Sequence, residues 1–414
     1  MNAVDENHGK ARVRGHCAPG WEAVADAFFE NFSERNELGA SVCVDVEGMR
    51  VVDLFGGHKG AEGDEPWEAD TISIVFSCTK AATALCAHIL VDRGELDLHA
   101  PVTRYWPEFG QNGKQDVTVL MMLNHSAGVP ALREPVKPGG YYDWDYMVER
   151  LAAEEPFWQP GTRNGYHMIT FGWTVGELVR RVSGRSLGSF FRDEVATPLG
   201  IDFWIGLPSE HVGRVAKMVP WIPEPGMAPM PFTQALMSDP KSIQFLSLLN
   251  SGGHAPDAPA AYAAEIGGAG GISNARGLAG MFQPLANSGV SRDGAVRLLS
   301  ADHVDRLRQV SMATQCDAML LAPTRFAQGF MRSMDNRHRP SGAMETAILG
   351  ERAFGHAGAG GSIGFADPDC GLAFGYSMNR MGAGILLNPR GQSLVDATYR
   401  VLGYRTDAPG FWTR

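Results

Sequence analysis

The first hydrophobic pattern of the chain predicts a helix. Apolar residues recur there every three or four positions, which is the spacing of one helix face. These residues are Trp21, Val24, Phe28 and Phe32. The residues before them, 1–18, are mostly polar, and we expect them to form a loose arm.

Strand patterns lie toward both ends of the chain. The β-rich segments 40–46 and 50–57 flank a short turn and predict a hairpin. A short apolar strand over 70–76 then leads into an uninterrupted helix over 80–93. Near the other end we expect three strands, over 354–358, 362–367 and 372–379, and a closing helix over 393–402.

Helical patterns joined by long loops fill the middle of the chain. Helices are predicted over 173–182 and 187–195, with a Ser-Gly pair between them. The segment 219–232 is rich in proline, which fixes φ and removes N–H donors. This segment is therefore predicted to be neither a helix nor a central strand.

This order of elements predicts an α+β fold. Strands from both termini would form one antiparallel sheet flanked by helices, with a mainly helical domain inserted between them. We place the discontinuous sheet domain at 1–94 and 268–414, and the inserted domain at 95–267. The cleft between the two domains is the expected binding site.

The composition fits a folded protein and excludes several function classes. With 44% hydrophobic residues over 414 positions, the chain has enough apolar material for a large core. A net charge of −10 argues against binding to nucleic acids or anionic membranes. We find no apolar stretch long enough to span a membrane and no signal-peptide pattern. We therefore expect a cytoplasmic protein.

Two Gly-x-Ser-x-Gly matches, centred on Ser186 and Ser362, first suggest an α/β-hydrolase. The nucleophile of that fold lies between a strand and a following helix. Ser186 falls between two predicted helices, and Ser362 falls between two predicted strands with no histidine after it. Both are better explained as ordinary serines in glycine-rich turns.

A stronger candidate is the Ser-x-x-Lys motif formed by Ser77 and Lys80, at a predicted strand-to-helix junction. Positions three apart share one face of a helical turn, so the Lys80 amine would lie near the Ser77 hydroxyl. The helix N-terminus and burial both disfavour the ammonium form, and a neutral lysine can take the serine proton. A second match at 238–241 follows no strand and is attributed to chance.

Two later segments complete a known pattern. The segment 160–166 ends in a tyrosine, and the glycine-rich segment 354–362 contains His-Ala-Gly on a predicted strand. The order Ser-x-x-Lys, Tyr, then Lys/His/Trp-x-Gly resembles the serine β-lactamase and penicillin-binding superfamily, most closely class C β-lactamases and family VIII carboxylesterases. The stretch 123–128 is also similar to a motif of that superfamily. The resemblance extends from about Gly20 to Leu402.

The resemblance implies a role for each motif residue. Ser77 would be the nucleophile, and Lys80 and Tyr166 would form its proton relay. A tyrosine beside two cationic groups is expected to ionise well below its usual pKa near 10. His356 would be the second of these groups, in the third-motif position where β-lactamases carry a lysine.

The same late strand would supply the oxyanion hole and part of the substrate site. The resemblance implies that the backbone N–H groups of Ser77 and Ala359 bind the oxyanion. Gly358 and its neighbouring glycines would let a substrate approach the strand closely, beside His356.

Two departures from the β-lactamase pattern favour an esterase. Met168 stands where β-lactamases have the asparagine of Tyr-x-Asn, so that side chain offers no amide to a lactam. His356 replaces a permanent lysine charge by one that a histidine carries only part of the time near neutral pH. We therefore expect a serine carboxylesterase that cleaves carboxylic esters through an acyl-enzyme on Ser77.

Other assignments remain open from the sequence. The same site could serve a β-lactamase, a D-amino-acid amidase or peptidase, or an acyltransferase, and the fold could also belong to a non-enzymatic binding protein. The intact Ser77, Lys80 and Tyr166 argue against the last of these. We find no motif for a metal or an organic cofactor, so the expected partner is a small-molecule ester. The pattern does not indicate an oligomeric state.

Several aromatic and histidine residues are expected to have structural roles. His125 and His167 are predicted to make structural hydrogen bonds. A run of aromatic residues is expected to pack in the core and loops, with the alternative that it lines an acyl or alcohol pocket. The run consists of Tyr141, Tyr142, Trp144, Tyr146, Phe157 and Trp158.

Overall fold

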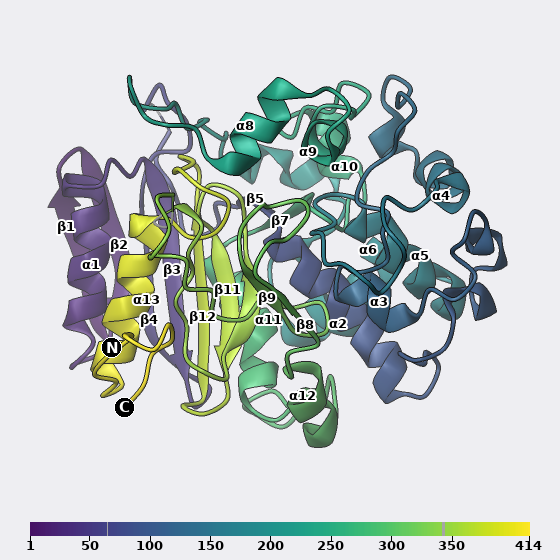
Figure 1. Ribbon diagram of the computed structural model, residues 1–414. Coiled ribbons are helices and arrows are strands. Elements are labelled where there is room, and N and C mark those ends of the chain that lie inside the picture. Colours follow the sequence, from purple (N-terminus) through teal and green to yellow (C-terminus); the bar gives the residue numbers. More distant parts are fainter. Residues whose placement is uncertain (64, 342–343) are drawn as a thin grey trace.

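The computed structural model describes residues 1–63, 65–341 and 344–414 (Figure 1). Its main sheet consists of β1 (Asn2–His8), β2 (Ala11–Cys17), β3 (Gly39–Val46), β4 (Met49–Gly57), β10 (Phe354–Ala357), β11 (Ile363–Asp367) and β12 (Leu372–Met378). The strand order is β1-β2-β4-β3-β12-β11-β10, and every neighbouring pair is antiparallel. Because β3 pairs with β12, the two ends of the chain meet in mid-sheet, and the predicted α+β fold is confirmed.

Helices surround this sheet and fill the middle of the chain. They are α1 (Glu22–Ser33), α2 (Cys78–Asp92), α3 (Val119–Leu123), α4 (Trp144–Ala153), α5 (Phe171–Ser183), α6 (Leu187–Phe191), α7 (Thr197–Leu199), α8 (Pro231–Ser238), α9 (Ile243–Leu248), α10 (Pro259–Ala263), α11 (Ala275–Ala286), α12 (Ala301–Leu307) and α13 (Pro389–Val401). A small sheet joins β5 (Ser73–Phe76), β7 (Gly271–Ser273) and β6 (Phe203–Trp204), and β8 (Met312–Thr314) pairs with β9 (Thr324–Phe326).

The two faces of the main sheet are covered by different helices. Helices α1 and α13 lie side by side on one face, where Phe28 and Leu394 share a core with Phe374 (Figure 1). Helix α11 packs on the other face so closely that a Cβ at Gly375 would lie 2.2 Å from the Ala275 carbonyl oxygen. Burial of both faces explains why β11 and β12 are entirely buried.

The N-terminal segment is a hairpin, and the predicted loose arm is wrong. β1 and β2 pair with each other, and β2 continues the sheet by pairing with β4. Ala11, Val13 and Cys17 alternate along β2 and point into the core, while β1 is the exposed edge strand. The alternation is faint in the sequence because Ala11, Gly15 and Cys17, at alternate positions of β2, are only weakly apolar.

Most of the predicted helices and strands lie within a few residues of their expected places. The segment expected as one helix over 187–195 forms α6 and then a π-helical turn, Arg192–Ala196. The boundaries of the inserted domain remain a prediction, although α3 to α10 all fall within 95–267. Among the described residues we find no helix that is both long and apolar enough to cross a membrane.

Candidate active site

Ser77 lies at the junction between β5 and α2. It occupies the N-cap position of α2, but its side chain makes no capping hydrogen bond, so the hydroxyl remains available for chemistry. The preceding residue, Phe76, has a φ of 44°, in the left-handed region that non-glycine residues rarely adopt. Strained backbone of this kind is typical of functional sites, and here it turns a strand directly into a helix.

Lys80 is fully buried one turn along α2. Its Nζ lies 3.1 Å from Ser77 Oγ and 2.6 Å from each of the carbonyl oxygens of Met168 and Gly268. A neutral amine has two N–H donors and one lone pair. The two carbonyls can take both donors, which leaves the lone pair for the Ser77 hydroxyl. Burial lowers the pKa of Lys80 well below its usual value, in the predicted direction, which favours the neutral amine that can take the serine proton.

Tyr166 lies on the other side of Lys80, whose Nζ is 4.6 Å from the centroid of the phenol ring. Burial raises the pKa of Tyr166, and a hydrogen bond with the Ser77 side chain offsets this only in part. The prediction that Tyr166 ionises below its usual pKa is therefore wrong. The positive charges expected beside it are disfavoured as well, because burial lowers the pKa of Lys80 and lowers that of His356 to about 3.

The loop that carries Tyr166 is fixed by hydrogen bonds on both sides. The Tyr166 N–H donates to both carboxylate oxygens of Asp317, at 3.0 and 3.1 Å. On the other side, the Gly165 N–H donates to the His125 carbonyl oxygen, and the Asn164 amide donates to that of Asn124. Sequence reasoning missed Asp317, because no motif surrounds it. The stretch 123–128, found by resemblance, supports the tyrosine loop.

The two buried histidines near Tyr166 make structural hydrogen bonds, as expected. The His167 N–H donates to His125 Nδ1, at 3.1 Å. The His167 ring accepts the Val129 N–H at Nε2 and contacts the Gly165 carbonyl oxygen through Nδ1. Burial lowers the pKa of His167 to about 4, so its ring is neutral at neutral pH.

Strand β10 is tied to the start of α2 by close backbone contacts. The Cys78 thiol donates to the His356 carbonyl oxygen at 3.2 Å, and the Ser362 hydroxyl donates to the Val75 carbonyl oxygen at 3.2 Å. A Cβ at Gly358 would lie 2.2 Å from that same Val75 oxygen, so the contact requires glycine. These bonds bring the His-Ala-Gly segment to Ser77 and give Ser362 a structural role.

A cavity of about 300 Å³ opens at Ser77. Its walls come from the β5–α2 junction, the tyrosine loop, helices α8 to α10, the end of β10 and the loop after β12. The lining residues are Ile74, Phe76, Ser77, Tyr166, Met168, Ile169, Phe232, Leu248, His254, Pro256, Ala261, Tyr262, Ala269, Gly270, Leu320, Ala359, Met381, Gly384 and Ile385. The aromatic run between 141 and 158 contributes none of these residues, so the alternative that it lines the pocket is wrong.

The remaining candidate serines lie outside this cavity. Ser186 caps α6 by accepting the Ser189 N–H, and its hydroxyl donates to a Glu265 carboxylate oxygen at 2.7 Å. Ser238 is the last residue of α8 and is exposed. Both observations agree with the sequence interpretation that these matches are not nucleophiles.

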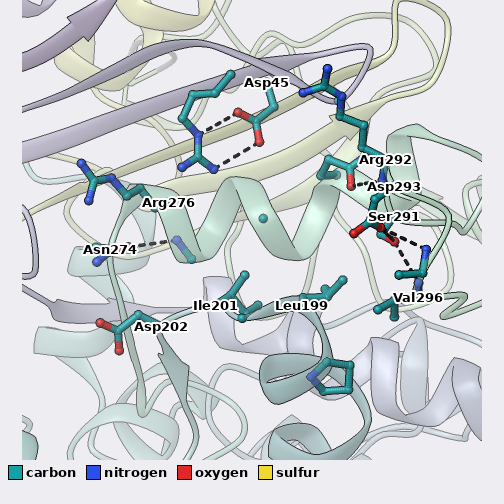
Figure 2. Close-up of a pocket in the computed structure, with 18 of the residues that line it drawn as sticks. Asp45, Leu199, Ile201, Asp202, Asn274, Arg276, Ser291, Arg292, Asp293 and Val296 are labelled. Atoms are coloured by element: carbon teal, nitrogen blue, oxygen red, sulfur yellow. Dashed lines mark hydrogen bonds and ion pairs between the residues drawn. The ribbon is translucent and has the colours of Figure 1, made fainter.

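A larger cavity, of about 620 Å³, lies beside α11 (Figure 2). Several of its charged side chains are already paired: Arg50 lies 3.0 Å from an Asp45 oxygen, and Arg276 lies 2.8 Å from an Asp53 oxygen. The Ser77 site does not extend into it. In the described part of the chain we find no group of three His, Cys, Asp or Glu side chains that could hold a metal ion.

The fold and the site together define a class of protein. A Ser-x-x-Lys pair with a buried lysine starts a helix, a tyrosine lies against the lysine, and the edge strand of an antiparallel sheet closes the site. This is the arrangement of the β-lactamase-like serine hydrolases. Residues 25–392 match the Beta-lactamase family model, and the chain belongs to that family.

Individual relatives include both esterases and penicillin-binding protein homologues. "Esterase/beta-lactamase LipL" of Mycobacterium tuberculosis is 37% identical over 377 residues, which cover 89% of this chain and 83% of LipL. The crystal structure of a family VIII carboxylesterase is 37% identical, with a TM-score of 0.82 over 94% of this chain and 99% of that one.

A penicillin-binding protein homologue from Caulobacter crescentus has a TM-score of 0.80 and 34% identity, covering 94% of this chain and 99% of that one. Together these relatives confirm the resemblance inferred from the motifs. They make this chain a serine hydrolase of the β-lactamase-like superfamily.

Proposed function

We propose that this protein is a serine carboxylesterase that cleaves neutral carboxylic esters through an acyl-enzyme on Ser77. The observation that carries the proposal is the uncharged lining of the Ser77 cavity. Among the lining residues, all of them in the described part of the chain, none is Asp, Glu, Lys or Arg. The carboxylate of a β-lactam and the ammonium of a D-amino-acid amide would therefore find no opposite charge in the walls.

Acylation begins with proton transfer from Ser77 to the neutral Lys80. Ser77 Oγ then forms a bond with the carbonyl carbon of the ester, and the carbonyl oxygen becomes an oxyanion. In this proposal the backbone N–H groups of Ser77 and Ala359 bind the oxyanion, and both residues line the cavity. When the intermediate collapses, the carbon–oxygen bond to the alcohol breaks and Lys80, with Tyr166, returns the proton to the leaving oxygen.

Deacylation reverses the sequence with water as the nucleophile. Lys80, beside Tyr166, accepts a proton from the attacking water and passes it to Ser77 Oγ as the acyl bond breaks, which releases the acid and restores the Ser77 hydroxyl. Gly358 itself does not line the cavity, and its missing side chain makes room for the Val75 carbonyl oxygen, which keeps Ala359 beside Ser77. His356 stays neutral and adds no positive charge to the site.

Matched kinetics with two chromogenic substrates test the substrate class. The value of kcat/KM for p-nitrophenyl butyrate should exceed that for nitrocefin on the same preparation, because only the lactam brings a carboxylate into the uncharged cavity. Ser77→Ala should abolish both reactions and serves as the control for contaminating hydrolases. A larger kcat/KM for nitrocefin would overturn the esterase proposal and leave the serine hydrolase in place.

Covalent labelling tests the nucleophile and the enzyme class independently. A fluorophosphonate should label the protein once, and peptide mass spectrometry should find the adduct on Ser77. A binding protein without activity would not be labelled at all. An adduct on Ser362 or Ser186 would show that the nucleophile is misassigned.

A further inference from the structure

We infer that His356 is a positioning residue whose Nε2 accepts the phenol hydrogen bond of Tyr166 and so turns the lone pairs of the Tyr166 oxygen toward Ser77. The inference rests on the proposed function and adds to it the direction of one hydrogen bond. Tyr166 Oη lies 3.5 Å from His356 Nε2. This distance is at the long end for a hydrogen bond, and such bonds at active sites often tighten when substrate binds.

The tautomer of His356 follows from its own backbone. Nδ1 lies 2.7 Å from the carbonyl oxygen of Ala357, and a carbonyl oxygen can only accept. Nδ1 must therefore carry a hydrogen. The ring is buried, with 3% of its surface exposed, and burial keeps it neutral, with a pKa lowered to about 3. A neutral ring with hydrogen on Nδ1 has a lone pair on Nε2, so Nε2 can only accept.

The remaining freedom at Tyr166 is the rotation of its hydroxyl hydrogen. The phenol ring stacks on Phe326 at 5.7 Å between ring centroids and packs against His125 at 4.8 Å, so it cannot swing. Buried Nε2 is an acceptor that needs a donor, and the Tyr166 O–H is the donor that faces it. Once that hydrogen points to His356, the oxygen presents only lone pairs to the Ser77 side.

This arrangement reverses the hydrogen bond that a lysine would make at position 356. An ammonium group has donors only, so the tyrosine oxygen would have to accept from it. With His356 in place, Tyr166 stays a neutral phenol that donates to the His356 ring and turns its lone pairs toward the Ser77–Lys80 pair. The raised pKa of Tyr166 agrees with a phenol that is not ionised.

Nitrogen-15 NMR of the wild-type protein labelled on histidine tests the tautomer directly. The His356 signals are identified by their absence from the spectrum of His356→Gln. We expect a protonated Nδ1 and an unprotonated Nε2 near neutral pH. A protonated Nε2 would overturn the inference whether or not the protein hydrolyses esters, so this result is independent of the proposed function.

Two substitutions of the same residue test the effect on turnover. Gln can place its carbonyl oxygen near the position of Nε2 and accept the phenol hydrogen, whereas Leu has no acceptor. His356→Gln should keep kcat for p-nitrophenyl butyrate within about tenfold of wild type, and His356→Leu should lose about 10²-fold, the cost of a misplaced reactive group. Equal losses in the two variants would contradict a positioning role, provided that circular dichroism shows both to be folded.

Discussion

Lys80 has contacts that suit two protonation states. At rest its two N–H groups can face the carbonyl oxygens of Met168 and Gly268, and its lone pair faces Ser77. Once it has taken the serine proton, the same two carbonyls and the π face of Tyr166 surround an ammonium group. The groups that stabilise the transient charge are thus in place before the charge exists, which is how preorganised sites reduce the barrier of a reaction.

Loss of either relay residue should slow turnover strongly. Lys80→Ala and Tyr166→Phe are each expected to reduce kcat by about 10²- to 10⁴-fold, the usual contribution of a general base. Because both side chains act on the same proton, the double variant should lose far less than the product of the two single losses. Steady-state kinetics with p-nitrophenyl butyrate measures all three. Losses that multiply fully would mean that the two residues do not share one proton path.

The reactive side chains could be predicted from the sequence, but the groups that tune them could not. Ser77 and Lys80 stand three positions apart on a predicted helix, and helical geometry alone brings them together. The acceptors for Lys80 are backbone carbonyls of distant loops, and any residue type supplies a carbonyl. For this reason Gly268 gave no signal, and the neutral state of Tyr166 was missed. Its pKa depends on burial in the folded chain.

Strand β10 and helix α2 form one unit around the site. The Cys78 thiol joins α2 to β10, while the Ser362 hydroxyl and the close approach of Gly358 join the loop after β10 to Val75 in β5, directly before α2. The position of the nucleophile relative to the oxyanion strand therefore depends in part on a backbone contact at Gly358 that leaves no space for a side chain. A substitution that adds a side chain at Gly358 should therefore disturb this contact more than a substitution that removes a nearby polar group.

A single methyl group at Gly358 should push the end of β10 away from β5. In Gly358→Ala the new Cβ would start 2.2 Å from the Val75 carbonyl oxygen, so β10 or β5 must shift. We expect a lower melting temperature together with a loss of kcat/KM for p-nitrophenyl butyrate. Gly60→Ala is the matched control, because a Cβ there meets no atom within 4 Å. Wild-type activity in Gly358→Ala would contradict the requirement for close contact.

Helices and strands with a strong periodic pattern of apolar residues could be predicted from the sequence. Strand β2 was missed because its apolar alternation is weak. The hairpin β3–β4, helix α2 and the last three strands carry dense apolar patterns, and all are confirmed. In β2 the inward positions include small or polarisable residues such as Ala11 and Cys17, so the strand pattern is faint. The assembly of the cavity from helices α8 to α10 was equally hidden, because it depends on tertiary packing.

Across the molecule, several histidines are fully buried and neutral. Burial lowers the pKa of His88 to about 3, that of His356 to about 3 and that of His167 to about 4. In the unfolded chain each of these side chains would titrate near pH 6.5. Between these two pH values the unfolded chain binds protons that the folded protein does not, so the contribution of each histidine to stability decreases as the pH falls.

His88 offers one such titration away from the active site, where its Nδ1 lies 2.9 Å from Nε2 of His303. The Nε2 of His88 lies 2.7 Å from the Gln328 carbonyl oxygen, and a glutamine amide can keep that bond. In wild type this histidine should reduce the free energy of unfolding by up to about 1.4 kcal/mol per pH unit as the pH falls from 6.5 to 4. His88→Gln should lack this loss. Urea unfolding at pH 7 and pH 5 measures the difference, and parallel pH slopes for the two proteins would contradict the burial of a neutral His88.

The pairing of β3 with β12 also determines the order of events during synthesis. β3 leaves the ribosome before β12, and the whole segment 47–371 is made between the two partners. Until then one edge of β3 has no partner, and open strand edges readily pair with other chains. Closing so distant a contact is slow, because the loop entropy must be overcome first. The newly made protein therefore passes through a period in which its central strand needs protection, and the last strands to be translated end that period.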